Sequence, residues 1–429
     1  MTATTRLLDL ARKRLPPDAL ELIDRAAAAA ASTGTSLYLV GGVVRDLLLG
    51  RPCLDIDLVL EGDAVSLAQD IGAGDSTRLL VHQAFGTATM RGEGFSLDLA
   101  SARSETYARP GALPAVKPGA IEEDLFRRDF TMNAMAIGLT GKGRGKIVDP
   151  WGGQSDIENR LIRVLHDRSF VDDATRILRA VRYEQRLGFG LEASTASLLQ
   201  RDIPMLNTIT GDRIRHELDR IFREELPERA LRRAGEVRVW SGLHPSLDRM
   251  DWIADAFRRA REAITPLPLP LCYALFLSHL DKEQASAVLT RLSAPSEITR
   301  VVLDTLAISA SMGPLSTAGV KPSQIYLMLR GFSPQAVVAS LATAGDWAAV
   351  RNLHLYLSKL RYVRPSLRGD DLVRMGAKPG PGLGELLSKL HRAKLDGEVR
   401  TKAGEAKLVR LMLSGRGIKR RRKAKRTTT

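Results

Sequence analysis

The chain has 429 residues, of which 44% are hydrophobic and 26% are charged, proportions that are ordinary for a soluble globular protein of two or three domains. Its apolar runs fall short of the roughly 20 residues that cross a bilayer, its first residues lack the apolar core of a secretory signal, and its two cysteines exclude a disulfide framework, so we expect a cytoplasmic protein without a membrane segment. The net charge of +15 favours a polyanionic partner.

The first elements along the chain predict a phosphate-binding turn. The N–H groups in the first turn of a helix lack partners and therefore attract phosphate. Gly42 ends the tight turn that leads into such a helix, and Arg45 lies in the first turn of the helix, where its planar guanidinium can bind phosphate oxygens. The elements that we expect are a helix at 7–31 interrupted by Pro16-Pro17, a buried strand at 36–40, a turn at Gly41-Gly42 and a short helix at 43–49.

A second strand follows directly and carries paired carboxylates. The alternation over residues 54–60 has a period of two, which places Asp55 and Asp57 on one face. Hard oxygen ligands suit Mg²⁺, and two ions about 3.5–4 Å apart can activate a hydroxyl and stabilise a leaving pyrophosphate. Each motif alone is mostly structural, but their combination predicts a site of nucleotidyl transfer. The apolar residues expected to face the core are Leu54, Ile56 and Leu58.

Strand-like segments at 86–90 and 95–99 alternate with helices up to about residue 164, which predicts a small sheet with helices on one side. Asp98 lies in one of these strands and either faces the metal site or pairs with Arg103 or Arg109. Residues 107–127 are rich in proline and glycine, so we expect a flexible loop there.

Beyond Leu161 the periodicity is helical, and residues 161–413 contain no convincing strand. Residues 266–272 predict a linker or a kinked entry to a helix, and residues 369–384 a connection rich in glycine and proline. The basic segment 416–426 is expected to be disordered by self-repulsion, and it serves either to grip RNA backbone or to keep the chain soluble.

The run from Leu39 to Leu60, with its Gly-Gly-Val-Val-Arg-Asp segment and its Asp-x-Asp strand, resembles the class II tRNA nucleotidyltransferase and bacterial poly(A) polymerase family of the polymerase β superfamily. The resemblance implies an α+β fold, in which a small mixed-sheet polymerase β-like nucleotidyltransferase head precedes an all-α neck, body and tail. The implied parts are a catalytic head at 1–160, a base-recognising neck at 161–225, a tRNA-binding body and tail at 226–415 and a basic end at 416–429. Further segments that follow the order of the family are 127–137, 149–153, 170–182, 186–189 and 212–222.

The resemblance also assigns roles to single residues. Asp55 and Asp57 correspond to the catalytic metal ligands of the family, and Gly42, Arg45 and Arg128 to residues near the phosphates and sugar. Asp173 and Arg176 correspond to the residues that read the base, with Arg179 and Arg182 along the same helix near the nucleotide. Asp129 is expected to orient Arg128 or to hold the ribose hydroxyl.

The spacing of the base-reading residues supports the same role. Asp173 and Arg176 stand three apart on an expected helix, so their charges should hold each other in place. A carboxylate beside a guanidinium matches cytosine and adenine, which both offer an amino group next to a ring nitrogen, and mismatches guanine and uracil. A helix with an ordinary basic face is the structural alternative.

The implied activity is template-independent addition or completion of the 3′-terminal CCA of tRNA from CTP and ATP, with Mg²⁺ as cofactor and pyrophosphate as product. The implied partners are the 3′ end and acceptor arm of tRNA, and no protein partner can be inferred. Three alternatives stay open: an enzyme that adds only the final adenosine, a poly(A) polymerase, and a non-catalytic RNA-binding protein on a transferase scaffold. The first shares every residue named above, whereas residues 82–89 favour a tRNA nucleotidyltransferase over a poly(A) polymerase.

Overall fold

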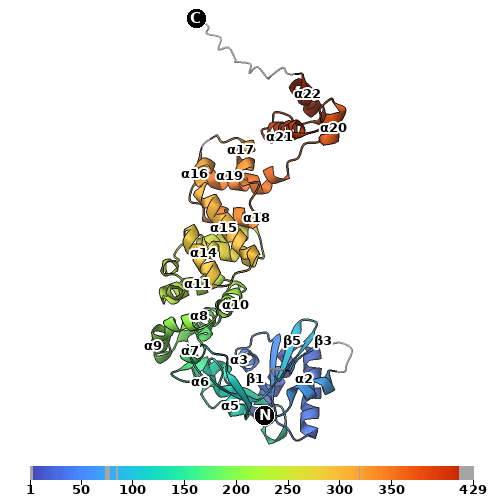
Figure 1. Cartoon of the computed structure of the whole chain (residues 1–429). Helices are drawn as coiled ribbons and strands as arrows, with labels where there is room; N and C mark the ends of the chain where they lie inside the picture. The colour runs from blue at the N-terminus through green and yellow to red at the C-terminus, as the bar shows by residue number, and fades with distance from the viewer. Residues whose placement is uncertain (1–2, 73–77, 84–85, 318, 415–429) are drawn as a thin grey trace. The chain divides into compact units, whose positions relative to one another are not determined.

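The computed structural model describes residues 3–72, 78–83, 86–317 and 319–414 (Figure 1). Contacts within the chain divide it into two compact units, Met1–Met250 and Asp251–Thr429. The expected head and neck both lie in the first unit, while the finer division into four parts stays a prediction. The basic segment 416–426 lies outside the described residues.

The expected first helix is confirmed as two helices, α1 (Ala3–Arg14) and α2 (Pro17–Ser32). The break falls at Pro16, where it is expected because proline lacks the N–H that a helix interior needs but tolerates the first position of the next helix. Helix α2 then buries Ala19, Leu22, Ile23, Ala26 and Ala30 against the rest of the head.

A seven-stranded mixed sheet forms the head, with the strand order β3-β4-β5-β2-β1-β8-β9. Strands β2 and β5 are parallel, and the other neighbouring pairs are antiparallel. The predicted small mixed sheet is therefore confirmed. The strands are β1 (Leu37–Val40), β2 (Asp55–Leu60), β3 (Arg78–His82), β4 (Thr87–Gly92), β5 (Phe95–Ser101), β8 (Ala136–Gly138) and β9 (Ile147–Val148).

Side chains alternate along β2, so its two faces contact different helices. Ile56 and Leu58 are 1% exposed and lie on the face that helix α4 (Ala64–Ile71) and α2 cover. Val59 lies on the opposite face, in a cluster with Ile121 and Leu125 of helix α5 (Ile121–Phe126). The prediction of helices on one side only is therefore wrong, because α5 covers the face that carries Asp55 and Asp57.

The expected flexible loop at 107–127 is partly regular. Strands β6 (Arg103–Thr106) and β7 (Ala115–Pro118) pair as an antiparallel hairpin, and α5 follows at once. The prolines and glycines occupy the turn of the hairpin, the last position of β7 and the short link to α5. The sequence pattern missed α5 because its core-facing pair, Ile121 and Leu125, spans little more than one helical turn.

The remainder of the first unit is mainly helical, as predicted. Two short parallel strands, β10 (Leu161–Ile162) and β11 (Gly190–Leu191), were not expected from the helical periodicity. The helices are α3 (Gly42–Leu48) beside β1, and then α6 (Gly153–Glu158), α7 (Ser169–Asp172), α8 (Thr175–Leu187), α9 (Ala193–Asp202), α10 (Gly211–Phe222) and α11 (Pro227–Glu236).

The described part of the second unit contains helices and no strand, which agrees with its sequence pattern. Residues 266–272 were predicted to be a linker or the entry to a helix, and they contain both: a short link is followed by helix α13, which begins at Leu269. Two helices, α20 and α21, flank the glycine- and proline-rich connection around residue 378. The helices are α12 (Ile253–Ala263), α13 (Leu269–Leu277), α14 (Lys282–Arg291), α15 (Ser296–Ala310), α16 (Met312–Ser316), α17 (Pro322–Leu329), α18 (Pro334–Thr343), α19 (Trp347–Ser358), α20 (Gly369–Arg374), α21 (Pro381–Leu395) and α22 (Lys402–Leu413).

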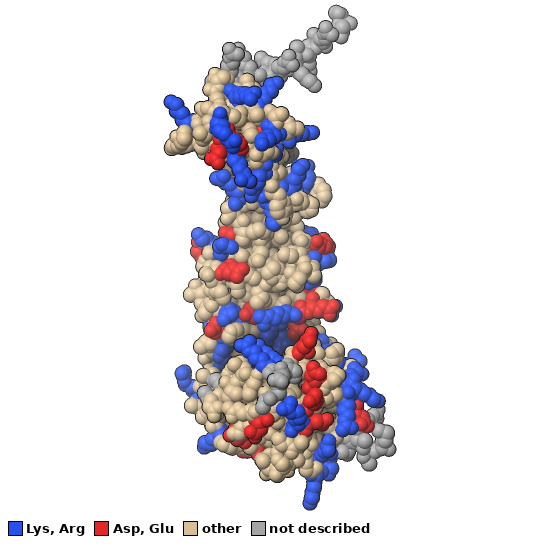
Figure 2. Space-filling view, turned by 90° about the vertical axis from the view of Figure 1, so that its right-hand side faces the viewer, with Lys and Arg blue, Asp and Glu red and all other residues tan. Residues whose placement is uncertain are grey.

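Basic side chains gather over the last helices on the face that Figure 2 shows. The C-terminal helices pack around a small apolar cluster that includes Leu372, Leu390 and Val409. In the part of the chain that the structure describes, no helix is long and apolar enough to span a membrane. The basic residues of α21 and α22 are Lys389, Arg392, Lys394, Lys402, Lys407 and Arg410.

A buried ion pair ties helix α8 to the head. Asp129 is 8% exposed, and its Oδ2 accepts hydrogen bonds from Nε and Nη2 of Arg179 at 2.9 and 2.6 Å. Its Oδ1 accepts from Nδ2 of Asn133 at 2.9 Å. Burial alone would raise the pKa of Asp129, but Arg179 and Asn133 outweigh it and lower the pKa to about 2 from an ordinary value of 3.8.

We expect Asp129→Asn to lower the free energy of unfolding of the first unit by about 3 kcal/mol at neutral pH, since it leaves the charge of Arg179 poorly compensated. Because the folded pKa lies below the unfolded value, the wild type should lose this stabilisation as the pH falls from about 4 to about 2, whereas the variant should not. Urea unfolding followed by circular dichroism between pH 2 and pH 7 measures both effects. Asp212→Asn removes an exposed partner of Arg215 and serves as the control. Equal losses in the two variants would contradict the assignment.

Candidate functional site

A cavity of about 750 Å³ opens in the first unit between the sheet and helices α8 and α10. Its lining combines acidic side chains from one strand of the head with arginines from the neck. All but one of the predicted site residues line it. Those that do are Gly42, Arg45, Asp55, Asp57, Arg128, Asp173, Arg176 and Arg179.

The carboxylates of Asp55 and Asp57 lie at the start of β2 and share one face, as predicted. Burial raises the pKa of Asp57, Arg128 lowers it, and the neighbouring Asp98, Asp55 and Asp124 raise it further. The net shift is upward, so the negative charge of Asp57 is costly in the absence of a cation. The prediction for Leu54 is wrong, because β2 begins only at Asp55 and Leu54 is 55% exposed at the rim of the cavity.

Asp98 stands beside Asp57 in the register of β2 and β5. Its Oδ1 accepts a hydrogen bond from Thr89 Oγ1 at 2.5 Å, while Arg103, one of its expected partners, forms an ion pair with Glu105 at 3.0 Å. Asp98 is not one of the residues that line the cavity. Among the described residues, no group of three or more Asp, Glu, His or Cys side chains is arranged to hold a metal, so the oxygen pair of Asp55 and Asp57 is the candidate set.

Asp124 is fully buried and positions two arginines at the cavity. Its Oδ1 accepts from Nη2 of Arg127 at 2.6 Å, and its Oδ2 accepts from Nη2 of Arg128 at 3.0 Å. The expectation that Asp129 orients Arg128 is therefore wrong, since Asp124 holds Arg128 and Asp129 holds Arg179. Gly41 adopts a φ of +77°, and a Cβ there would collide with Nη1 of Arg128. Glycine at this turn is thus required by the backbone, and a Cβ there would also displace the end of the Arg128 side chain.

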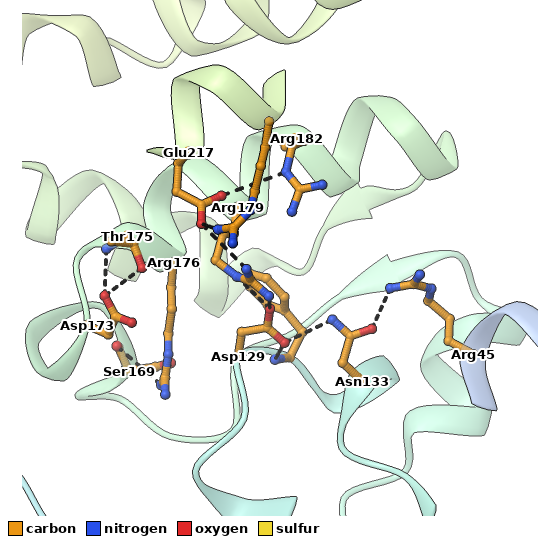
Figure 3. A network of polar contacts seen from close by, with 12 residues as sticks. Arg45, Asp129, Asn133, Ser169, Asp173, Thr175, Arg176, Arg179, Arg182 and Glu217 are labelled. Atoms are coloured by element: carbon orange, nitrogen blue, oxygen red, sulfur yellow. Dashed lines mark hydrogen bonds and ion pairs between the residues drawn. The ribbon is translucent and has the colours of Figure 1, made fainter. Parts of the chain in front are cut away.

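A chain of hydrogen bonds runs from α3 to α8 across the cavity wall (Figure 3). Arg45 is 3% exposed and donates from Nη1 to Oδ1 of Asn133 at 2.6 Å. Its Nε and Nη2 donate to Asp46 at 2.8 and 2.9 Å. The predicted phosphate ligand therefore lies at the cavity with its guanidinium already oriented by Asp46 and Asn133.

Tyr183 brings three guanidinium groups together. The guanidinium carbons of Arg45, Arg179 and Arg182 lie 5.1, 5.7 and 4.7 Å from the centre of its ring. These distances are within the range in which a cation is attracted to an aromatic face. The ring thus moderates the repulsion among arginines that crowd one wall of the cavity.

The two base-reading candidates both lie at the cavity, but they do not hold each other as expected. Asp173 lies after the end of α7 in an extended conformation, and α8 begins only at Thr175, so Asp173 and Arg176 do not share a helix. Asp173 instead forms an ion pair at 2.8 Å with Arg213 of α10. Arg176 is buried and donates to Oγ of Ser169 at 2.7 Å and to the carbonyl oxygen of Arg127 at 2.6 Å.

Arg182 is the predicted site residue that the structure does not bring to the cavity. Its Nη1 lies 3.1 Å from Oε1 of Glu224, and its Nε lies 3.9 Å from Oε2 of Glu217. Glu217 also pairs with Arg179 at 3.6 Å (Figure 3). It forms a further ion pair with Arg220. Arg182 therefore braces α8 against α10 from behind the cavity wall.

Sequence reasoning missed several cavity residues whose signal was present. Asp124 precedes Arg127 and Arg128 by three and four positions, a spacing that predicts contacts on a helix. Glu217 and Arg213 lie in the segment 212–222, which was matched to the family by its order along the chain and not by a role at the cavity. Among the cavity residues that were missed are Asn133, Tyr183, Arg213 and Glu217, with Asp124 behind them.

The carboxylates of Asp55 and Asp57, the half-buried guanidinium of Arg128 and further arginines converge on one cavity, and this combination suits a metal-bound polyphosphate. The carboxylate oxygens of Asp55 and Asp57 are the ligand type that Mg²⁺ prefers, and Mg²⁺ in such sites commonly takes one or two carboxylates together with phosphate oxygens. The raised pKa of Asp57 is the observation that favours a cation beside it, since a bound cation would offset the cost of its charge. The residues present therefore fit Mg²⁺.

Comparison with known proteins gives related enzymes over most of the chain. Residues 37–163 match the family described as "Poly A polymerase head domain", and residues 188–250 match "Probable RNA and SrmB- binding site of polymerase A". An A-adding tRNA nucleotidyltransferase of Halalkalibacterium halodurans is 35% identical over 406 residues, which cover 92% of this chain and 93% of that protein. One of Geobacter sulfurreducens is 34% identical over 391 residues, covering 87% of this chain, but the chain spans only 44% of that relative.

Solved structures agree with this relationship. A Thermotoga maritima CCA-adding enzyme complexed with tRNA has a TM-score of 0.77 and 30% identity, covering 95% of this chain and 98% of that chain. Proteins named CC-adding and CCA-adding enzymes also match the sequence. The mixed-sheet head, the paired aspartates of β2 and the similarity along nearly the full length of the Halalkalibacterium protein show that the chain belongs to the family of class II tRNA nucleotidyltransferases and bacterial poly(A) polymerases.

Proposed function

We propose that the protein is a tRNA nucleotidyltransferase that builds or completes the 3′-terminal CCA of tRNA from CTP and ATP, with release of pyrophosphate. One observation carries the proposal: a single cavity is lined by the Asp55/Asp57 pair, by Arg128 and by the two base-reading candidates, Asp173 and Arg176. Solved CCA-adding enzymes with ATP, with CTP and with tRNA support the choice of substrates.

In this proposal the head residues carry the chemistry. Asp55 and Asp57 would hold Mg²⁺, which when bound activates the terminal hydroxyl of the RNA and neutralises charge on the leaving pyrophosphate. Arg128, which Asp124 holds, would bind phosphate oxygens through Nη1, which lies beside Gly41 and near Asp57. Gly42 and Arg45 would bind the nucleotide on the side of α3.

The neck residues would select the base. Oδ1 of Asp173 accepts from Thr175 and Arg213, while its other oxygen is available to accept from the amino group of cytosine or adenine. Arg176 would donate to the adjacent ring nitrogen. Arg179 lies on the nucleotide side of α8, and Arg182 would contribute through Tyr183, whose ring it covers at 4.7 Å.

A second candidate is addition of the final adenosine alone. The observation that favours it is the similarity to two enzymes named A-adding, one of which matches over 93% of its length. The site residues named above serve either activity, so the geometry does not select between them.

We expect ATP to extend a tRNA that ends in CC in the presence of Mg²⁺. A complete CCA-adding enzyme should also extend tRNAs that end before CCA and after the first C, whereas an A-adding enzyme should leave them unchanged. The assay uses the three tRNAs, each with CTP alone, ATP alone and both, and separates the products by length. Long adenosine tails would indicate a poly(A) polymerase, and failure to extend any of the three tRNAs would refute the proposal.

Asp55→Ala and Asp57→Ala should each reduce nucleotide addition by roughly a hundredfold or more, because each removes a ligand that the chemical step needs. Their affinity for tRNA should stay close to that of the wild type, since the reaction and not the RNA contact is lost. Asp98→Ala, tested beside them, separates a ligand from a bystander: Asp98 contacts Thr89 and does not line the cavity, so we expect most of the activity to remain, whereas a comparable loss would make Asp98 a third carboxylate of the site. Activity retained by either of the first two variants would exclude the proposed metal ligands.

Asp173→Ala should relax discrimination against GTP and UTP more than it slows addition of the correct nucleotide. Loss of one base contact of this kind is worth about 1–3 kcal/mol of discrimination, or roughly tenfold to a hundredfold. Single-nucleotide extension of a tRNA ending in CC, with each of the four triphosphates in turn, measures the ratio. Unchanged selectivity would mean that the base is read elsewhere in the cavity.

A further inference from the structure

Arg213 occupies a position between the base-reading carboxylate and the hairpin of the head. It lies in the first turn of α10, and its side chain is 27% exposed at the cavity. Its Nη2 donates to Oδ1 of Asp173 at 2.8 Å, and its Nη1 donates to the carbonyl oxygen of Gly111 at 3.2 Å. One guanidinium therefore links three segments that are far apart in the sequence.

The hydrogen bonds to Asp173 are unevenly distributed over its two oxygens. Oδ1 accepts from the backbone N–H of Thr175 at 2.9 Å and from its hydroxyl at 2.6 Å, in addition to Arg213. Oδ2 accepts no hydrogen bond from the described residues, and in Figure 3 it lies on the side of Arg176. Arg213 and Thr175 together thus fix the rotation of the carboxylate so that one defined oxygen remains for a ligand.

Gly111, the second residue that Arg213 binds, lies close to the backbone of Thr208. Gly111 lies in the turn of the hairpin formed by β6 and β7 and has a φ of +70°, which L side chains rarely adopt. A Cβ at Gly111 would stand 2.5 Å from the carbonyl oxygen of Thr208, so no side chain fits without moving the turn. The turn of the hairpin therefore packs against the neck at Gly111, the residue that Arg213 binds.

We infer that Arg213 is a positioning residue for base selection, because it holds Asp173 so that Oδ2 faces the base. Since Arg213 also binds Gly111, the orientation of Asp173 depends on the position of the β6–β7 hairpin. The inference rests on the proposed role of Asp173 as the residue that reads the base. Base selectivity then depends on both contacts of Arg213, the one with Asp173 and the one with Gly111.

Arg213→Met keeps most of the side-chain volume and removes both hydrogen bonds. We expect it to reduce selectivity for ATP over GTP and UTP by roughly tenfold, as loss of one hydrogen bond to a charged group predicts, with a smaller effect on kcat for ATP. Arg213→Lys should recover part of the selectivity, since an ammonium can reach one of the two acceptors. Gly111→Ala should resemble Arg213→Met, because it displaces the hairpin from the same link.

The link also predicts how the variants combine. If Arg213 acts through Asp173, the double variant Arg213→Met/Asp173→Ala should be no less selective than Asp173→Ala alone. Arg215→Met is the matched control: Arg215 lies on the same helix but pairs with Asp212 and Asp219. An additive loss in the double variant, or an equal slowing of all four nucleotides, would show a purely structural role and overturn the inference.

The experiment measures kcat and KM for each triphosphate with a tRNA ending in CC, and the affinity of each protein for ATP, CTP, GTP and UTP by calorimetry. Failure of the wild type to extend the tRNA would refute the proposed function, whereas calorimetry would still report whether Arg213→Met changes preference among bases. Reduced tRNA affinity with unchanged preference would make Arg213 an RNA contact and overturn the inference.

Discussion

The two buried carboxylates of Asp124 and Asp129 determine where three arginines of the cavity lie, namely Arg127, Arg128 and Arg179. Asp124 directs Arg127 and Arg128 from the end of α5, and Asp129, only five residues later, holds Arg179 of α8. A buried carboxylate without its partner is strongly unfavourable, so each of these contacts also fixes the relative position of the elements that supply the two charges. The short stretch from Asp124 to Asp129 therefore orients Arg127 and Arg128 on the sheet side and fastens the neck to the head.

This arrangement keeps a dense set of arginines in place before any anion is bound. Arg45, Arg179 and Arg182 surround the ring of Tyr183, and Asp46, Asp129, Glu217 and Glu224 supply the opposing charges. Guanidinium groups that are already oriented lose little side-chain freedom when they meet a phosphate. Arg128 is the clearest case, because Asp124 engages Nη2 while Nη1 lies beside Gly41 and Asp57, next to the paired carboxylates.

Much of this site could be predicted from the sequence because its signals are local. The Gly-Gly turn and the alternation of β2 each span a few residues, and Asp55 and Asp57 lie on one face because a strand has a period of two. The errors arise where a local pattern ends. Leu54 stands one position before the strand begins, and Asp173 stands before the start of α8, so extending the strand or the helix by one or two residues gave the wrong neighbours.

Contacts between distant segments could not be predicted in the same way. Arg213 lies 40 positions from Asp173 and Arg179 lies 50 positions from Asp129, and nothing in the spacing of either pair indicates contact. The sequence of α10 predicts an amphipathic helix with a charged face, which is compatible with a surface helix as well as with a cavity wall. The packing of α10 against α8 shows that α10 forms a wall of the cavity, since Arg213 and Glu217 line it.

Contacts between distant segments also matter for the choice between CTP and ATP. Relatives named A-adding, CC-adding and CCA-adding all match this chain over most of its length, so a shared set of site residues is compatible with different products. A carboxylate and a guanidinium that pair with both cytosine and adenine cannot by themselves choose between them, because both bases offer an amino group beside a ring nitrogen. Preference between the two must then come from the position and orientation of that edge relative to the phosphates. If Asp173 and Arg176 form this edge, as proposed, its position in this chain is determined by other residues: Ser169 and Arg127 hold Arg176, and α10 holds Asp173.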